Sequence, residues 1–224
     1  RGGSKGLRGK HLRMLGGRPL LQWTVEAAFA AQSVDEVVVS SDDEDILALA
    51  AELGCTCIVR PSTLATDDAP TVPVIVHALQ HLAGPEITVV LQATSPLRTA
   101  SHIDGALAVL RDGEANAVIS VTEPHQTPYK CLRENASGYL EGLIDPALPF
   151  TPRQRLPRAL YPNGAIYAIS TDVFLAGEQL LTTATLPYVM PRAASIDIDT
   201  AEDLLVAETL LHSHWSGVRT GTDG

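Results

Sequence analysis

Residues 19–40 read PLLQWTVEAAFAAQSVDEVVVS and decide the fold class, because a helical pattern passes directly into a strand pattern. Residues 19–31 place apolar side chains at helical spacing, and Pro19 stands in the first turn, where no backbone N–H donor is needed. Residues 34–40 contain a continuous run of valines, which is typical of a strand covered by helices on both faces. The stretch therefore predicts a helix followed by a buried strand.

The same alternation continues along the chain. Helices are expected at residues 45–53, 72–82, 101–110, 172–176 and 201 to about 212, and strands at 55–60, 87–91, 117–121, 165–169 and, at an edge, 186–190. Ser101 with Asp104 has the spacing of a capping box, and Thr200 with Asp203 caps the last helix. These elements predict an α/β fold with a doubly wound, mostly parallel, Rossmann-like sheet that binds ligands at the carboxyl ends of its strands.

Two segments depart from this alternation. Residues 122–162 are rich in proline and arginine and contain only short β-like pieces at 129–134 and 138–143, so we expect a functional excursion, either a lid or a dimerisation segment. Residues 213–224 are polar and glycine-rich and are expected to form a disordered tail. The α/β domain then comprises residues 1–121 and 163–212.

Upstream of the first helix, residues 1–18 (RGGSKGLRGKHLRMLGGR) hold six of the 16 Lys and Arg residues of a chain with net charge -10. So local a positive block indicates a seat for an anion. Its glycines, Gly2 and Gly3 among them, let backbone N–H groups approach a ligand, and Lys5, Arg8 and Lys10 would suit a polyphosphate. Neither G-x-x-x-x-G-K-[ST] nor G-x-G-x-x-G is present, and an ordinary solvated basic loop is the alternative.

A glycine-rich phosphate loop normally follows the end of a buried strand. We therefore expect a natural first strand directly before Arg1, outside the sequence given.

Asp197 and Asp199 are two residues apart in an extended stretch, so both carboxylates are expected on one side while the flanking isoleucines pack on the other. Two such carboxylates make a good Mg²⁺ seat, since Mg²⁺ commonly takes one or two of them and completes its shell with water and phosphate oxygens. Polar residues on the wet side of an edge strand are the alternative. The turns at 92–98 and 162–167 read either as ligand-binding loops or as plain turns beside a strand.

Composition narrows the function classes. The length of 224 residues, with 45% hydrophobic and 19% charged residues, suits one folded domain of a globular protein. The acidic balance argues against nucleic acid as a partner, and no apolar run approaches the length of a membrane span. Cys55, Cys57 and Cys131 lack metal-ligand spacing and are expected to be reduced core thiols of a cytoplasmic protein.

Several of these stretches, in family order and spacing, resemble the acylneuraminate cytidylyltransferases, the CMP-sialic acid synthetase family. The matching pieces are RGGSKGL at 1–7, VVVSSDD at 37–43, Arg60-Pro61 with Leu64-Ala65, LQATSPLR at 91–98, PNGAIY at 162–167, and SIDIDT at 195–200 followed by EDL at 202–204. The resemblance implies that CTP reacts with a nine-carbon 2-keto sugar acid to give a CMP-sugar and pyrophosphate, with Mg²⁺. It also implies a homodimer held by the excursion.

The resemblance further implies a role for each matching residue. The implied CTP-binding set is Arg1, Gly2, Gly3, Ser4, Lys5, Lys10, His11, Gln92 and Ser95. The implied sugar-acid set is Gln92, Arg98, Lys130, Arg153, Tyr161, Asn163 and Tyr167. The implied catalytic residues are Arg1, Lys5, Lys10 and Asp199, with Asp197 and Asp199 as metal ligands.

Two residues depart from the family pattern. His11 stands where the family usually has Asn, and Tyr161 stands where many members have an Arg that could pair with the sugar carboxylate. One alternative is the same transfer to another acceptor, such as another nonulosonate, a shorter 2-keto acid or a phosphonate. Two others are a metal-dependent glycosyltransferase that uses D-x-D and a nucleotide-binding regulatory protein.

Overall fold

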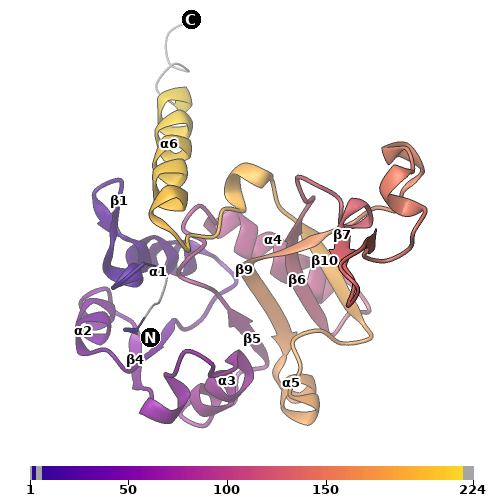
Figure 1. The fold of residues 1–224 in the computed structure, drawn as a ribbon. Coiled ribbons are helices and arrows are strands. Elements are labelled where there is room, and N and C mark those ends of the chain that lie inside the picture. Colours follow the sequence, from indigo (N-terminus) through magenta and orange to yellow (C-terminus); the bar gives the residue numbers. More distant parts are fainter. Residues whose placement is uncertain (1, 4–6, 219–224) are drawn as a thin grey trace, which may run out of the picture.

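The structure, a computed structural model, describes residues 2–3 and 7–218, with side chains as far as His212. Helices cover a central sheet on both faces, and helices and strands alternate along the chain (Figure 1). This arrangement confirms the predicted α/β class.

The central sheet contains four strands in the order β10-β6-β9-β5. Their bounds are β5 Ile87–Val90, β6 Ala117–Thr122, β9 Tyr161–Ser170 and β10 Thr185–Val189. β10 runs parallel to β6 and lies at an edge, as predicted, whereas β9 is antiparallel to both β6 and β5. The sheet is therefore mixed. The segment between β6 and β9 contains no α-helix, so these two strands do not form a βαβ unit.

A second, two-stranded parallel sheet stands beside β5. It pairs β3, Val38–Ser41, with β4, Thr56–Val59, and the helix α2, Glu44–Glu52, connects them. Among the described residues, neither β3 nor β5 has a second strand neighbour on its other edge.

Helices pack on both faces of the sheet. On one face, α1 (Leu20–Ala30) and α4 (Ala100–Asp112) form a core with β6 and β9 that includes Ala28, Ile103 and Ile166. On the other face, α3 (Thr71–Leu79) and α5 (Thr171–Gly177) pack against the same strands. The sheet is thus enclosed by helices that follow the predicted pattern closely.

The remaining elements lie outside the central layers (Figure 1). The excursion carries an antiparallel hairpin of β7, Leu132–Glu134, and β8, Leu140–Gly142, within the two predicted β-like pieces. A short hairpin of two-residue strands, β1 (Met14–Leu15) and β2 (Arg18–Pro19), precedes α1. Single 3-10 turns are η1 Lys10–Leu12, η2 Ser62–Leu64, η3 Pro128–Lys130, η4 Leu148–Phe150, η5 Arg153–Arg155 and η6 Arg192–Ala194.

Three local predictions need correction. The helix α4 begins earlier than expected, and its capping box joins Thr99 and His102, while Asp104 accepts hydrogen bonds from the backbone N–H groups that follow α1. The last helix, α6, runs over Ala201–Val218 and so passes the predicted end at His212; residues 219–224 of the predicted tail lie outside the described residues. Residues 195–199 form no strand. Within residues 2–3 and 7–218, no helix is both long and apolar enough to cross a membrane.

Candidate active site

A cavity of about 930 Å³ opens at the carboxyl ends of β3 and β5. Segments from the two ends of the chain and from the loop after β5 meet there. The predicted site residues that line it are Lys10, His11, Gln92, Asp197 and Asp199. The structure therefore brings the basic amino-terminal turn and the acidic segment together in the place where an α/β sheet binds ligands.

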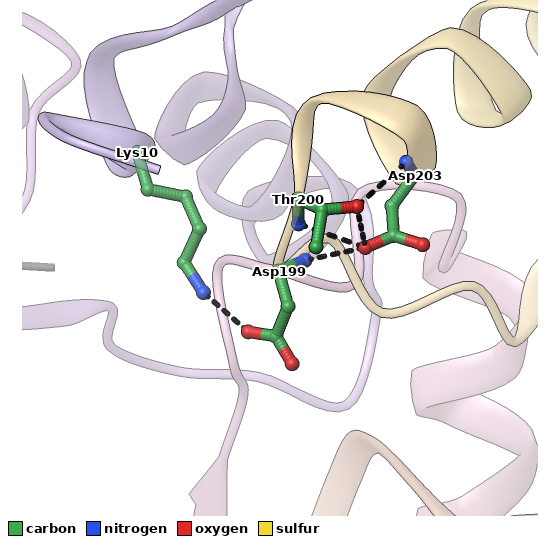
Figure 2. Close-up of polar contacts among 4 residues, drawn as sticks. All are labelled: Lys10, Asp199, Thr200 and Asp203. Atoms are coloured by element: carbon green, nitrogen blue, oxygen red, sulfur yellow. Dashed lines mark hydrogen bonds and ion pairs between the residues drawn. The ribbon is translucent and has the colours of Figure 1, made fainter. Parts of the chain in front are cut away.

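Lys10 and Asp199 form the central contact of the site (Figure 2). Gly9 has a left-handed backbone, with φ of 63°, and this turn starts the 3-10 helix that carries Lys10. Lys10 Nζ lies 2.8 Å from Asp199 Oδ1; the lysine side chain is 10% exposed and the aspartate side chain 71%. A nearly buried ammonium thus points at an open carboxylate, which a ligand can reach.

Asp203 fixes the backbone of that carboxylate at the start of α6. Its Oδ2 accepts hydrogen bonds from the N–H groups of Asp199 and Thr200 and from the Thr200 hydroxyl, which in turn accepts from the Asp203 N–H (Figure 2). Desolvation raises the pKa of Asp203, but the hydrogen bonds from Thr200 and Asp199 outweigh it, so this pKa lies below its ordinary value. The predicted Thr200 cap is confirmed, and it orients the site.

Asp197 is exposed, like Asp199, and lines the same cavity. Desolvation, opposed by a hydrogen bond from the Thr94 side chain, raises the pKa of Asp197, and the nearby Asp199 adds to this rise. Ile198 between them is fully buried and donates its N–H to the Thr94 carbonyl oxygen at 2.8 Å. Both carboxylates face the same cavity without a strand, because the buried Ile198 holds the extended segment in place.

Arg98 is a buried residue that connects two segments beside the site. The residue is 2% exposed, and its Nη1 donates to the carbonyl oxygens of Gln92 and Ala165. Burial lowers the pKa of Arg98 to about 10. The guanidinium joins the loop after β5 to β9, and it is absent from the lining of the cavity.

Asn163 is also buried and organises the segment beside Arg98. Its Oδ1 accepts from the Ser120 hydroxyl at 2.6 Å, and its Nδ2 donates to Ser195 Oγ at 2.8 Å. Ser95 is fully buried and donates to the Asn163 carbonyl oxygen. Gly164 has φ of 73°, and a Cβ there would lie 2.3 Å from Gln92 Oε1, so the glycine lets Gln92 approach β9.

The other predicted residues take varied positions. Gly2 donates its N–H to Asp42 Oδ1 at 3.0 Å, directly after β3, and Gly3 faces open space. Tyr161 is exposed, whereas Tyr167 is half-buried, and burial together with the nearby Asp197 raises the Tyr167 pKa.

Two predicted residues of the excursion lie away from the cavity, and three predicted residues of the amino-terminal loop are not described. Exposed Lys130 and Arg153 lie in the excursion and are absent from its lining. Arg1, Ser4 and Lys5 lie outside the described residues.

Three residues of the site were not predicted to take part in it. Thr94 holds Asp197, Asp203 holds the Asp199 backbone, and Arg60 lines the cavity and donates to the Ser40 carbonyl oxygen. Each of these three residues lies in a motif described above. Their contacts could not be predicted, because the partner is either distant in sequence or part of a turn whose geometry residue spacing does not specify.

Solved structures share this fold. CMP:2-keto-3-deoxy-manno-octonic acid synthetase complexed with CTP superposes with a TM-score of 0.71 at 20% identity, covering 95% of each chain. At this identity the likeness shows that the two chains share an α/β fold.

The family follows from the sequence comparisons. The family profile described as cytidylyltransferase matches residues 1–136, and the chain belongs to this family. It is 34% identical over 212 residues to the N-acylneuraminate cytidylyltransferase of Escherichia coli O18:K1:H7 (strain RS218 / NMEC), covering 94% of this chain and 50% of that protein. It is 29% identical to the pseudaminic acid cytidylyltransferase of Campylobacter jejuni subsp. jejuni serotype O:2 (strain ATCC 700819 / NCTC 11168), covering 94% and 92%. The chain spans about half the length of the N-acylneuraminate cytidylyltransferases it matches.

Proposed function

We propose that this chain transfers the cytidylyl group of CTP to a sialic-acid-like 2-keto sugar acid and releases pyrophosphate. The observation that carries the proposal is the contact between Lys10 and Asp199 inside the cavity at the strand ends. It sets a cation for phosphate oxygens beside a carboxylate suited to a metal ion. The family membership and the names of the relatives support CTP and the acceptor class.

The acidic residues suit Mg²⁺ better than a metal ion whose ligands all come from the protein. Asp197 and Asp199 face one cavity, and no group of three or more His, Cys, Asp and Glu in the described part of the chain could hold a metal ion. Mg²⁺ usually keeps several waters and binds through one or two carboxylates plus substrate phosphates. When bound, Mg²⁺ would neutralise charge on the phosphate oxygens and increase the acidity of the attacking hydroxyl.

The chain's own groups position and neutralise the reactants. The acceptor's anomeric hydroxyl attacks the α-phosphorus of CTP in line, so negative charge grows on the departing pyrophosphate. Lys10, released from Asp199 toward the phosphates, counters this charge, and its largely buried side chain is held in place for that contact. Asp199 then becomes available to the metal ion, since its partner lysine has turned to the nucleotide.

The acceptor end of the site lies toward β9. Tyr167 stands close enough to Asp197 for the carboxylate to raise its pKa, and Gln92 lies against Gly164. Arg98 and Asn163, both buried, act as positioning residues for these side chains. Tyr161 replaces the family arginine, so we propose that the acceptor carboxylate is held by another group than residue 161.

The excursion supports the proposal of a homodimer. Tyr139, Leu140 and Phe150 are 72%, 71% and 86% exposed, and the excursion that carries them lies outside the α/β layers (Figure 1). Apolar surface of this kind marks an interaction site. Light scattering should give twice the chain mass, and Leu140→Glu should shift the protein toward the monomer; a monomeric parent chain would refute the homodimer.

The free thiols support a cytoplasmic location. Cys57 and Cys131 are exposed, so the expectation that they lie in the core is wrong for these two, and all three cysteines are free. Exposed thiols persist in a reducing compartment.

The decisive assay is pyrophosphate release from CTP and Mg²⁺ with a panel of 2-keto sugar acids. We expect release only when an acid is supplied, with a CMP-linked product. Asp199→Asn should retain less than about a tenth of the activity, since a metal-binding carboxylate is worth several kcal/mol. Glu202→Gln, an exposed change of equal charge three residues away, serves as the matched control.

Two results would overturn the proposal. The first is Asp199→Asn activity above about a tenth of the parent value with unchanged dependence on Mg²⁺. The second is transfer of a sugar from a nucleotide-sugar without pyrophosphate release, which is the reaction of a D-x-D glycosyltransferase.

A further inference from the structure

Two histidines lie one turn apart at the end of α3, and the active site described above uses neither of them. His77 lies in the last turn of α3, and His81 lies in the turn that follows, where its N–H donates to the Ala78 carbonyl oxygen at 3.0 Å. Residues four positions apart on a helical path share one face, so the two rings are neighbours. His77 is half-buried and His81 is exposed, so solvent reaches the pair.

The separation of the two rings is that of a metal chelate. A metal ion binds an imidazole nitrogen at about 2.0–2.1 Å, and with an angle of about 90–110° at the ion the two ring centroids lie about 4.5–5.2 Å apart. The centroids of the His77 and His81 rings are 4.7 Å apart, with 50° between the ring planes. Two histidines at this spacing on one helix face are a known arrangement for holding Zn²⁺.

Hydrogen bonding prepares both rings for a metal ion. His81 Nδ1 lies 2.8 Å from the His77 carbonyl oxygen, and because a carbonyl oxygen can only accept, Nδ1 carries the proton. In the neutral ring Nε2 then keeps its lone pair, and metal-binding histidines commonly donate their other N–H to such a carbonyl. His77 Nδ1 is buried and has no hydrogen-bond partner among the described residues. A bound ion would give this nitrogen a partner.

We propose that His77 and His81 together bind one divalent transition-metal ion of the class of Zn²⁺, Ni²⁺ and Cu²⁺. Imidazole nitrogen suits these ions, whereas Mg²⁺ prefers oxygen ligands. The described residues contain no group of three or more His, Cys, Asp and Glu that could hold a metal ion, so the two rings are the protein's ligands and water completes the shell. For the same reason, this site is separate from the carboxylates of Asp197 and Asp199.

The ion would join the last turn of α3 to the turn after it. α3 presents Val74, Ala78 and Leu79 to the cavity, whereas His77 and His81 are absent from its lining. A bound ion therefore stabilises a wall of the cavity without entering it. The inference rests on the two histidines and does not depend on the proposed reaction.

Calorimetric titration with Ni²⁺ in the presence of Mg²⁺ tests the inference. Mg²⁺ occupies carboxylate sites, and prior alkylation of the exposed thiols of Cys57 and Cys131 removes competing soft ligands. We expect one Ni²⁺ per chain, displacement by Zn²⁺ but not by further Mg²⁺, and a Tm that rises with Ni²⁺ because the ion binds the folded helix.

His77→Gln is the decisive variant. It removes one ring but keeps the backbone carbonyl of residue 77, so the hydrogen bond from His81 stays in place. We expect Ni²⁺ to bind at least about tenfold more weakly, because the second contact is no longer intramolecular. His81→Gln should give a similar loss. Gln80→Ala, an exposed change between the two histidines, should bind Ni²⁺ as the parent chain does.

Three outcomes would overturn the inference. The first is equal Ni²⁺ affinity of the parent chain and His77→Gln. The second is Ni²⁺ binding that disappears when the thiols are alkylated, because the cysteines would then be the ligands. The third is one Ni²⁺ per two chains, because a second copy would then supply ligands. None of these measurements uses CTP, so a failure here is distinct from a failure of the proposed reaction.

Discussion

Two halves of the molecule contain strands of similar composition that are buried to different extents. We call the part around β6 and β9 the closed half and the part around β3, β4 and β5 the open half. β6 is buried over five of its six residues, whereas β5 and the valines of β3 are only half-buried. β6 has a strand on each side and helices on both faces, while β3 and β5 line the cavity. The difference teaches that an apolar run predicts a strand, but its burial depends on neighbours contributed by distant parts of the chain.

The largest effect should come from the closed half. Ile166→Ala in β9 removes a fully buried side chain and should lower the free energy of unfolding by about 2–5 kcal/mol. Val89→Ala in β5 should cost about 1 kcal/mol, because part of that side chain already faces the cavity. Urea unfolding measures both variants. Equal losses of unfolding free energy in the two variants would contradict the comparison, since they would mean that β5 is packed as tightly as β9.

The buried network of the closed half should give the next effect. Asn163→Ala leaves the Ser120 and Ser195 hydroxyls without their amide partner and should cost about 1–3 kcal/mol in urea unfolding. Gln154→Ala, an exposed change in the excursion, should stay within about 0.5 kcal/mol. A loss for Asn163→Ala as small as that of the control would show that water replaces the amide and that this half is open as well.

The same contrast shows which features of the fold could be predicted from sequence. Local periodicity located all of the predicted helices and the strands of the central sheet, because both patterns are written in neighbouring residues. It missed the antiparallel direction of β9, which depends on where the chain returns to the sheet after the excursion. It also missed the cap at Thr99, which depends on a side chain one helical turn away.

The candidate site divides in the same way. The basic turn and the two aspartates could be predicted from their residue types, and the structure brings Lys10 to Asp199. The burial of Arg98 could not be predicted, because it follows from the packing of β9 against the loop after β5.

A smaller effect tests whether the halves unfold together. Asp43 caps α2 by accepting from the Ile46 N–H, so Asp43→Ala should cost about 0.5–2 kcal/mol. We expect the whole loss to appear in global unfolding, because α1 packs on α2 through Val25 and on α4 through Ala28. Hydrogen exchange of α2 provides the comparison. Faster exchange of α2 with unchanged urea unfolding would mean that the open half unfolds by itself.

The smallest effect concerns the packing around α2 and β4. Burial, with a smaller contribution from Cys57, raises the pKa of Cys55 to about 11, and Cys55 packs against the cluster of Leu21 and Ile46. Since the thiolate is the reactive form, iodoacetamide at pH 8 should alkylate Cys55 at least about tenfold more slowly than exposed Cys131, as followed by peptide mass spectrometry. Equal rates would show that this cluster opens readily, and the open half would then be loosely packed beyond the cavity itself. A slow Cys55 would confine the openness to the space between β3 and β5, because the helices around that space would be firmly packed.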